Sequence, residues 1–296
     1  MGLAAPDGRV KVRNMRNIVY EYFSDLQHRQ RIIIALARGG AMMATRTVDL
    51  SRPASWEFSG FSQNGEDGIT DVLRQQLSEP NRRFVEIGAA DGLQNNTSWL
   101  LVMQQYSGLL IEGDKGLSAR AARLLPGYGI GTEVRQLFVT RANAAAVVQG
   151  EQYKDPDVFS LDVDGNDYHI CRAMLECGFR PKICVVEYNS AYGASRSLTI
   201  RYQDEFDFRR ADATQLYYGV SLAGWRKLFD KHGYRFVTVE RNGVNAFFID
   251  PAHFTPAFLE NLRPLEFAGN RYQDAKFRIT HEEQFGLIAT KEFVDI

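Results

Sequence analysis

The chain of 296 residues is poor in cysteine, with only Cys171, Cys177 and Cys184. None of them has the Cys-x-x-Cys spacing of a zinc or redox motif. An odd number of cysteines without a framework is typical of a reducing compartment. We therefore expect three unpaired thiols that pack as small, buried apolar groups.

Long apolar runs and an excess of one charge are also lacking. The first apolar run, Ile32 to Ala37, has six residues and lies between Arg31 and Arg38, whereas a membrane span needs about 20. The 35 basic and 36 acidic side chains give a net charge of -1, so nothing calls for a nucleic-acid or anionic-membrane partner. Because the N-terminus carries no secretion signal, we expect a cytoplasmic protein without a membrane span.

Residues 1–58 differ in pattern from the rest of the chain. Apolar and charged residues alternate at helical spacing from Asn17 to Arg38, which predicts one or two helices that Gly39-Gly40 would end. The segment is too apolar for a free tail, so we expect this N-terminal helical extension to pack on the core or on a second subunit. The sequence leaves a homo-oligomer open.

From Phe61 onward, short apolar runs alternate with helix-like segments. The runs are Arg83–Ile87, Gly108–Ile111, Val134–Val139, Val158–Val163 and Ile183–Val186. Helices are expected at Ile69–Leu77, Ser98–Tyr106, Ser118–Leu125 and Asp167–Cys177. This alternation predicts βαβ units and a parallel sheet.

The end of the pattern is different. Tyr234–Glu240 and Val244–Ile249 flank Asn242-Gly243, which is a strong hairpin signal. Five parallel strands and a terminal antiparallel hairpin predict a doubly wound α/β fold with a Rossmann-like methyltransferase sheet over residues 59–250. Residues 251–296 would form a C-terminal extension.

The stretch Phe84–Gly92 joins an apolar strand to a loop of small residues, where open α/β sheets bind ligands. Its pattern, Glu86-x-Gly88-x-x-x-Gly92, differs from the GxGxxG dinucleotide fingerprint. A carboxylate at Glu86 would repel a pyrophosphate but could accept hydrogen bonds from a cationic amino-acid group. S-adenosylmethionine has such a group and no phosphate.

Glu112 ends the second predicted strand, 26 residues after Glu86. An acid at this point of the fold can accept hydrogen bonds from both ribose hydroxyls of a cofactor. The alternative is a solvated strand end.

Acidic residues follow the fourth and fifth predicted strands. Asp162 and Asp164 come after one strand, and Glu187 and Asn189 after the next. These four residues could hold Mg²⁺, which takes one or two carboxylates and keeps several waters. The cation could bind two sugar hydroxyls and lower the pKa of the attacking one, while a carboxylate takes the proton. Alternatively, Asp162 and Glu187 orient cofactor or substrate directly, or 164–167 is only a turn and helix cap.

Four blocks, Phe61–Gly68, Phe84–Gly92, Leu161–Tyr168 and Val185–Asn189, together with Gly243–Phe248, resemble the FkbM-like branch of the class I methyltransferases. The resemblance implies S-adenosylmethionine as cofactor and a sugar hydroxyl of a glycan, glycolipid or glycosylated metabolite as acceptor, as in polysaccharide biosynthesis. The candidate cofactor-binding residues are Gln63, Glu66, Glu86, Gly88, Ala89, Asp91, Gly92, Asn96, Glu112, Gly113, Asp114 and Asp162. The segment around Gln63 and Glu66 would close over the methionine end of the cofactor, or else only cap a helix.

The related TylF-like sugar methyltransferases place a metal at this position with paired acids after the fifth strand. This chain has Glu187-Tyr188-Asn189 there, so the metal stays an open question. Asp162 is one candidate catalytic residue, and His169, just after the acidic cluster, is a second candidate as general base. The alternative for His169 is a structural role in the first turn of a helix.

Residues 190–218 form a segment long enough to be functional, and we expect a lid over the active face. Its arginines, Arg196, Arg201, Arg209 and Arg210, could meet the phosphate of a nucleotide-linked sugar. The alternative is a subunit-packing arm. Competing functions are a methyltransferase for a non-sugar acceptor, a nicotinamide-dependent oxidoreductase and a non-catalytic cofactor-binding protein.

Overall fold

A seven-stranded mixed sheet lies at the centre of the computed structural model, which describes residues 8–149 and 153–296. The strand order is β3-β2-β1-β4-β5-β8-β7. The strands are β1 Arg83–Ile87, β2 Ser107–Glu112, β3 Glu133–Gln136, β4 Val158–Leu161, β5 Ile183–Glu187, β7 Arg235–Val239 and β8 Asn245–Ile249. Strands β1 to β5 are parallel, and β8 lies antiparallel between β5 and β7. This confirms the predicted Rossmann-like sheet with its terminal hairpin.

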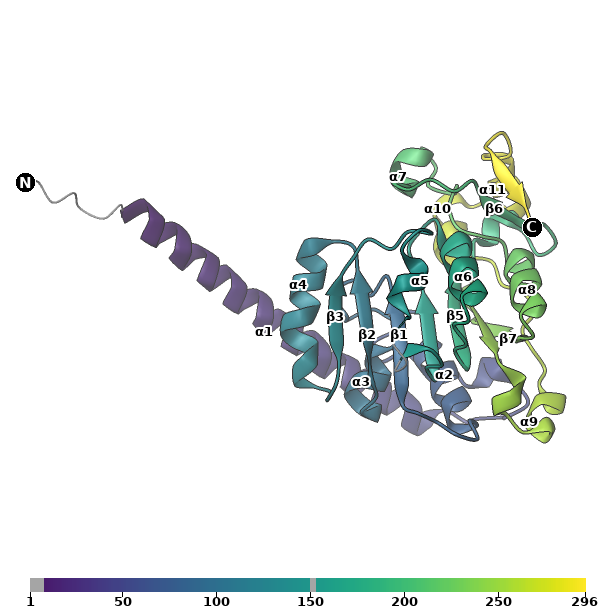
Figure 1. Ribbon diagram of the computed structural model, residues 1–296, viewed down its shortest axis with the longest axis horizontal. Coiled ribbons are helices and arrows are strands. Elements are labelled where there is room, and N and C mark those ends of the chain that lie inside the picture. Colours follow the sequence, from purple (N-terminus) through teal and green to yellow (C-terminus); the bar gives the residue numbers. More distant parts are fainter. Residues whose placement is uncertain (1–7, 150–152) are drawn as a thin grey trace, which may run out of the picture.

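Helices cover both faces of the sheet (Figure 1). They are α2 Glu66–Gln75, α3 Ser98–Gln104, α4 Lys115–Leu124, α5 Ala144–Val147, α6 Asp167–Glu176, α8 Leu222–Lys231 and α9 Pro256–Asn261. Because successive side chains of a strand point to opposite faces, Val85 and Ile87 pack with α6 and α8, whereas Phe84 packs with α2 and α3. All three cysteines are unpaired, but Cys177 is exposed because it follows the last turn of α6.

The N-terminal region forms one long helix, α1 Gly8–Thr45, whose first half projects away from the sheet (Figure 1). The prediction that Gly39-Gly40 ends the helix is wrong. A Cβ on Gly39 would lie 2.5 Å from the Trp99 ring and 2.9 Å from Gly60 Cα. The glycine therefore lets α1 cross the core closely, and Ile32 and Ala35 are buried in the same contact.

The segment 190–218 and the last part of the C-terminal extension, residues 270–296, fold together beside the sheet (Figure 1). They contain η4 Ser190–Tyr192, β6 Leu198–Ile200, α7 Phe208–Ala211, α10 Arg271–Phe277, α11 His281–Gly286 and β9 Phe293–Asp295. Strands β6 and β9 pair antiparallel, and a small apolar core with Tyr192 and Ile288 joins the two segments. Short 3-10 turns lie at Pro53–Ser55, Leu125–Gly127 and Pro251–His253. Within the described ranges, none of the helices combines the length and apolarity needed to cross a bilayer.

Candidate functional site

The glycine loop after β1 is shaped by contacts within the protein. Gly88 and Gly92 have φ angles of +87° and +75°. A Cβ on Gly88 would lie 1.6 Å from the carbonyl oxygen of Asp162, and one on Gly92 would lie 2.2 Å from a methyl of Leu125. The space saved by these glycines is used by the protein's own backbone and core. Ala89 is fully buried, and the close approach of a cofactor to this loop stays a prediction.

The buried carboxylate of Glu86 binds the residues that follow the glycine loop. It accepts hydrogen bonds from Nδ2 of Asn95, the backbone N–H of Asn96 and the hydroxyl of Thr97. Burial raises the pKa of Glu86, and these donors oppose the rise. The Asn96 amide donates to Ser160 Oγ at 3.0 Å. Both predicted cofactor residues therefore brace the loop.

Glu112 at the tip of β2 bridges two loops. Its Oε2 accepts the N–H of Ala90 at 2.8 Å, and its Oε1 accepts the N–H of Asp114 at 2.7 Å. Asp114 caps α4 by accepting the N–H of Leu117 at 2.8 Å. Gly113 lies against Phe138, where a Cβ would come within 2.9 Å. Glu112 is half-buried, so part of its carboxylate is open to solvent.

Asp91 in the glycine loop contacts the N-terminal helix and α4. Its Oδ2 lies 3.2 Å from His28 Nε2, 3.3 Å from an Arg31 Nη1 and 3.6 Å from an Arg120 Nη1. His28 and Arg31 belong to α1, and Arg120 to α4. The carboxylate therefore fastens the loop to two helices, and the assignment of Asp91 as a cofactor residue stays a prediction.

Two buried carboxylates, those of Asp67 and Glu66, hold the segment before α2 by hydrogen bonds. Oδ2 of Asp67 accepts three consecutive backbone amides, from Gly60 to Ser62, at 2.7 to 2.9 Å. Glu66 accepts Nδ2 of Asn64 at 3.0 Å and Nδ2 of Asn245 at 2.8 Å. Glu66 therefore joins the segment to β8, while Gln63 is exposed at the turn.

The structure brings the predicted acidic residues together at the tips of β4 and β5. One carboxylate oxygen from each of Asp162, Asp164 and Glu187 lies within 4.8 Å of the other two. Asp164 has φ +54°, a left-handed conformation that turns the loop at this point. Burial raises the pKa of Asp162 and of Glu187, and in each case neighbouring carboxylates add to the rise. Burial and Asp167 raise the pKa of Asp164 to about 6.

The raised pKa values have a chemical meaning. Three carboxylates in one place repel one another, so their ionised forms are less stable than in water and a nearby cation would stabilise them. Oε2 of Glu187 is buried and has no hydrogen-bond partner in the described part of the chain. The same holds for Oδ1 of Asn95. The site is thus an acceptor-rich region suited to a cationic ligand.

Two predicted residues hold the segment 190–218 in place. Nε2 of His169 lies 2.9 Å from the carbonyl oxygen of Ile200, and burial lowers the pKa of His169. The Asn189 amide donates to the carbonyls of Leu216 at 2.7 Å and Tyr218 at 3.1 Å. These contacts make both residues anchors of the segment, and the roles of His169 as general base and of Asn189 as metal ligand stay predictions.

The arginines of this segment are also engaged. Arg196 pairs with Glu282 at 2.6 Å, and Arg201 with Glu292 at 2.9 Å. Arg210 lies 3.4 Å from Asp207. These pairs weaken the expectation that the three bind a phosphate, whereas Arg209 lowers the pKa of Asp164 by its charge.

Two residues of the site were not among the sequence candidates. Tyr218 is buried, and the charges of Glu187 and Asp164 add to the burial that raises its pKa. Asn245 faces Glu187 across the β5–β8 ladder, and its Oδ1 has no partner in the described part of the chain. The only available signal for Asn245 was its place in the Gly243–Phe248 block.

Comparisons with known proteins give distant likenesses only. No family model matches the chain, and no curated protein matches it. An O-methyltransferase from Bacillus cereus in complex with SAH aligns with a TM-score of 0.42 and 13% identity, over 74% of this chain and 89% of that chain. The SAH-bound Podospora anserina methyltransferase PaMTH1 aligns with a TM-score of 0.41 and 13% identity, over 84% of this chain and 99% of that chain. The O-methyltransferase TomG from Streptomyces achromogenes aligns with a TM-score of 0.40 and 16% identity, over 64% and 80%. Our assignment of the fold depends on the strand order and not on these similarities.

Proposed function

We propose that the chain is an S-adenosylmethionine-dependent O-methyltransferase that acts on a sugar hydroxyl of a glycan, glycolipid or glycosylated metabolite. One observation carries the proposal. The glycine loop after β1, Glu112 at the tip of β2 and the acidic cluster at the tips of β4 and β5 lie at one edge of the sheet. In open α/β sheets, ligands bind at this edge.

The residues fit a cationic cofactor better than a dinucleotide. Glu86, Asp162 and Glu187 surround the loop with carboxylates, which oppose a pyrophosphate. An ammonium group could donate to the buried oxygens of Glu187 and Asn95 that lack partners in the described chain. Glu112 could use its remaining lone pairs for ribose hydroxyls. When bound, S-adenosylmethionine supplies an electrophilic methyl group.

The chain's own residues would then prepare the acceptor. Asp162 or Glu187 would accept the proton from the attacking hydroxyl. The hydroxyl of Tyr218 lies near these carboxylates, because their charges contribute to its raised pKa. The segment 190–218, held by Asn189 and His169, would exclude water from this region.

The acidic cluster also fits Mg²⁺. Asp162, Asp164 and Glu187 offer one carboxylate oxygen each, all within 4.8 Å of one another, and Mg²⁺ prefers oxygen ligands of this kind. The metal would supply positive charge that keeps a substrate hydroxyl deprotonated.

The cofactor assignment is tested by calorimetry with S-adenosylhomocysteine, NAD and ATP. We expect binding of S-adenosylhomocysteine alone, and Glu112→Ala should weaken it by about 1–3 kcal/mol. Glu133→Ala is the control, because its carboxylate pairs with Arg135 on the edge strand β3. Tighter binding of NAD than of S-adenosylhomocysteine would contradict the proposal.

A further inference from the structure

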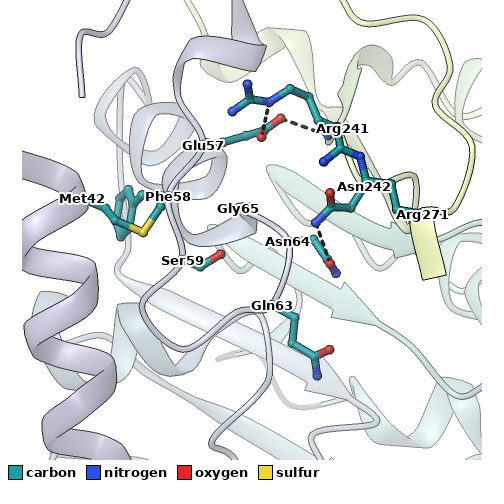
Figure 2. Close-up of a pocket in the computed structure, with 10 residues that line it drawn as sticks. All are labelled: Met42, Glu57, Phe58, Ser59, Gln63, Asn64, Gly65, Arg241, Asn242 and Arg271. Carbon is teal, nitrogen blue, oxygen red and sulfur yellow. Dashed lines mark hydrogen bonds and ion pairs between the residues drawn. The ribbon is translucent and has the colours of Figure 1, made fainter. Parts of the chain in front are cut away.

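A polar cavity of about 330 Å³ is lined on one side by the Gln63–Gly65 turn (Figure 2). Its walls come from α1, the segment before α2, the β7–β8 hairpin and the start of α10. The lining residues are Met42, Glu57, Phe58, Ser59, Gln63, Asn64, Gly65, Arg241, Asn242 and Arg271. Three of these residues are charged. Arg241 and Arg271 each carry a guanidinium group, and Glu57 carries a carboxylate.

The carboxylate is committed to one of the arginines. Glu57 accepts the backbone N–H of Arg241 at 3.0 Å and its Nε at 2.7 Å (Figure 2). The Glu57 side chain is 7% exposed, whereas that of Arg241 is 59% exposed. Arg241 is therefore held by its Nε edge, and its terminal Nη groups have no partner in the described part of the chain.

The second guanidinium is uncompensated. Arg271 is exposed at the start of α10, and its backbone N–H donates to the carbonyl of Asn242 at 2.9 Å. Its side chain makes no ion pair with any side chain that the structure describes. By contrast, Arg196, Arg201 and Arg210 all have acidic neighbours.

Hydrogen bonds connect the cavity to Asn245, the residue of β8 that is paired in register with Glu187. Asn242 Nδ2 donates to Asn64 Oδ1 at 3.1 Å, and Asn64 Nδ2 donates to Glu66 at 3.0 Å. Glu66 in turn accepts Asn245 Nδ2 at 2.8 Å. Asn245 faces Glu187 across the β5–β8 ladder. The cavity and Glu187 are thus linked through Asn64, Glu66 and Asn245.

We propose that this cavity binds an oxyanion, a phosphate or a carboxylate, carried by the sugar acceptor. Guanidinium groups bind such anions through paired N–H donors. The amide of Gln63 and the hydroxyl of Ser59 would add neutral donors, and Phe58 and Met42 an apolar wall. The inference rests on the proposed function, since it assigns part of the acceptor's binding site.

Calorimetry of the full-length protein with S-adenosylhomocysteine present tests the inference. The probes are glucose 1-phosphate, glucuronate, methyl glucoside and inorganic phosphate. We expect one or both charged sugars to bind at least about tenfold more tightly than methyl glucoside, the effect of one charged hydrogen bond. The preferred sugar identifies the anion. Equal affinity for charged and neutral sugars, or inorganic phosphate binding as tightly as the sugar phosphate, would overturn the inference.

Variants locate the site. Arg271→Ala should abolish the preference for a charged sugar, and Arg271→Lys should retain part of it, because the charge stays while the fork is lost. Arg235→Ala is the matched control, an exposed arginine at the start of β7 outside the cavity. An unchanged preference in Arg271→Ala, or an equal loss in Arg235→Ala, would overturn the assignment. Binding of S-adenosylhomocysteine is measured on each variant, so a failed cofactor assignment is separated from a failed anion site.

Discussion

Nε2 of His28 in α1 lies 3.2 Å from Oδ2 of Asp91 in the glycine loop. The two residues are 63 positions apart, and both are buried. Arg31 and Arg120 add positive charge to the same oxygen. The N-terminal helix is therefore fastened directly to the loop on which the proposed cofactor site depends.

Replacing Asp91 by Asn should loosen this attachment. The variant removes the negative charge that faces His28, Arg31 and Arg120 and leaves a single amide oxygen as acceptor, so we expect a loss of about 1–3 kcal/mol in the free energy of unfolding and faster proteolysis within α1. Asp25→Asn is the control, because its pair with Arg123 is partly exposed and should contribute under about 1 kcal/mol. Equal proteolysis of the two variants would show that the Asp91 contacts do not hold the helix.

Gly88 offers a second prediction. Alanine there would adopt φ +87° and push its Cβ into the Asp162 carbonyl. We expect Gly88→Ala to lower the free energy of unfolding by about 2–4 kcal/mol and to abolish binding of S-adenosylhomocysteine. Gly127→Ala is the matched control, because no atom lies within 4 Å of its added Cβ. Chemical denaturation with calorimetry measures both effects, and a stable Gly88→Ala protein would refute the packing role.

Asp164 predicts a dependence of stability on pH. Its pKa is raised from 3.8 to about 6, so the folded protein binds the proton more tightly than the unfolded chain does. Ionisation of Asp164 therefore lowers the free energy of unfolding above about pH 6, and this loss becomes smaller as the pH falls toward 4.

Asp164→Asn removes this cost, and asparagine tolerates the left-handed backbone. We expect the variant to be more stable than wild type at pH 7.5 by about 1 kcal/mol, a figure reduced for solvent screening. The gain should vanish near pH 4. Asp230→Asn on the exposed end of α8 should change little at either pH. A gain that is constant from pH 4 to 7.5 would exclude titration of Asp164 as its cause.

The sheet was predictable because its strands are buried on both faces and read as continuous apolar runs. The predicted run Arg83–Ile87 coincides with β1, and the others differ by a few residues at their ends. The pairing of β6 with β9 was not predictable, since their partners are nearly 100 positions apart and each strand has three residues. The length of α1 was missed for another reason. Gly39 is explained by its close contacts with Trp99 and Gly60, and contacts so distant in sequence leave no local signal.

The site was predictable in outline, because the carboxyl ends of parallel strands meet at one edge. This brought Asp162, Asp164 and Glu187 together as expected. The orientation of individual side chains was not predictable. Asp91 and Asn189 have the residue types of ligands, but tertiary hydrogen bonds turn them toward α1 and toward the segment 190–218.

The last prediction concerns the acidic cluster. Burial and neighbouring carboxylates raise the pKa of both Asp162 and Glu187 at adjacent strand tips, so each is less stable as a carboxylate than it would be in water. Such an arrangement is retained where a ligand needs it. If Mg²⁺ is that ligand, tenfold excess over its dissociation constant should add about 1.4 kcal/mol to the free energy of unfolding. Glu187→Gln should lose this stabilisation, Asp230→Asn should keep it, and a chelator should abolish methyl transfer to an accepted sugar.

If the carboxylates act directly on the hydroxyl, the chelator will have no effect while Asp162→Asn still abolishes activity. Full activity in both Asp162→Asn and Glu187→Gln would remove the chemistry from this cluster.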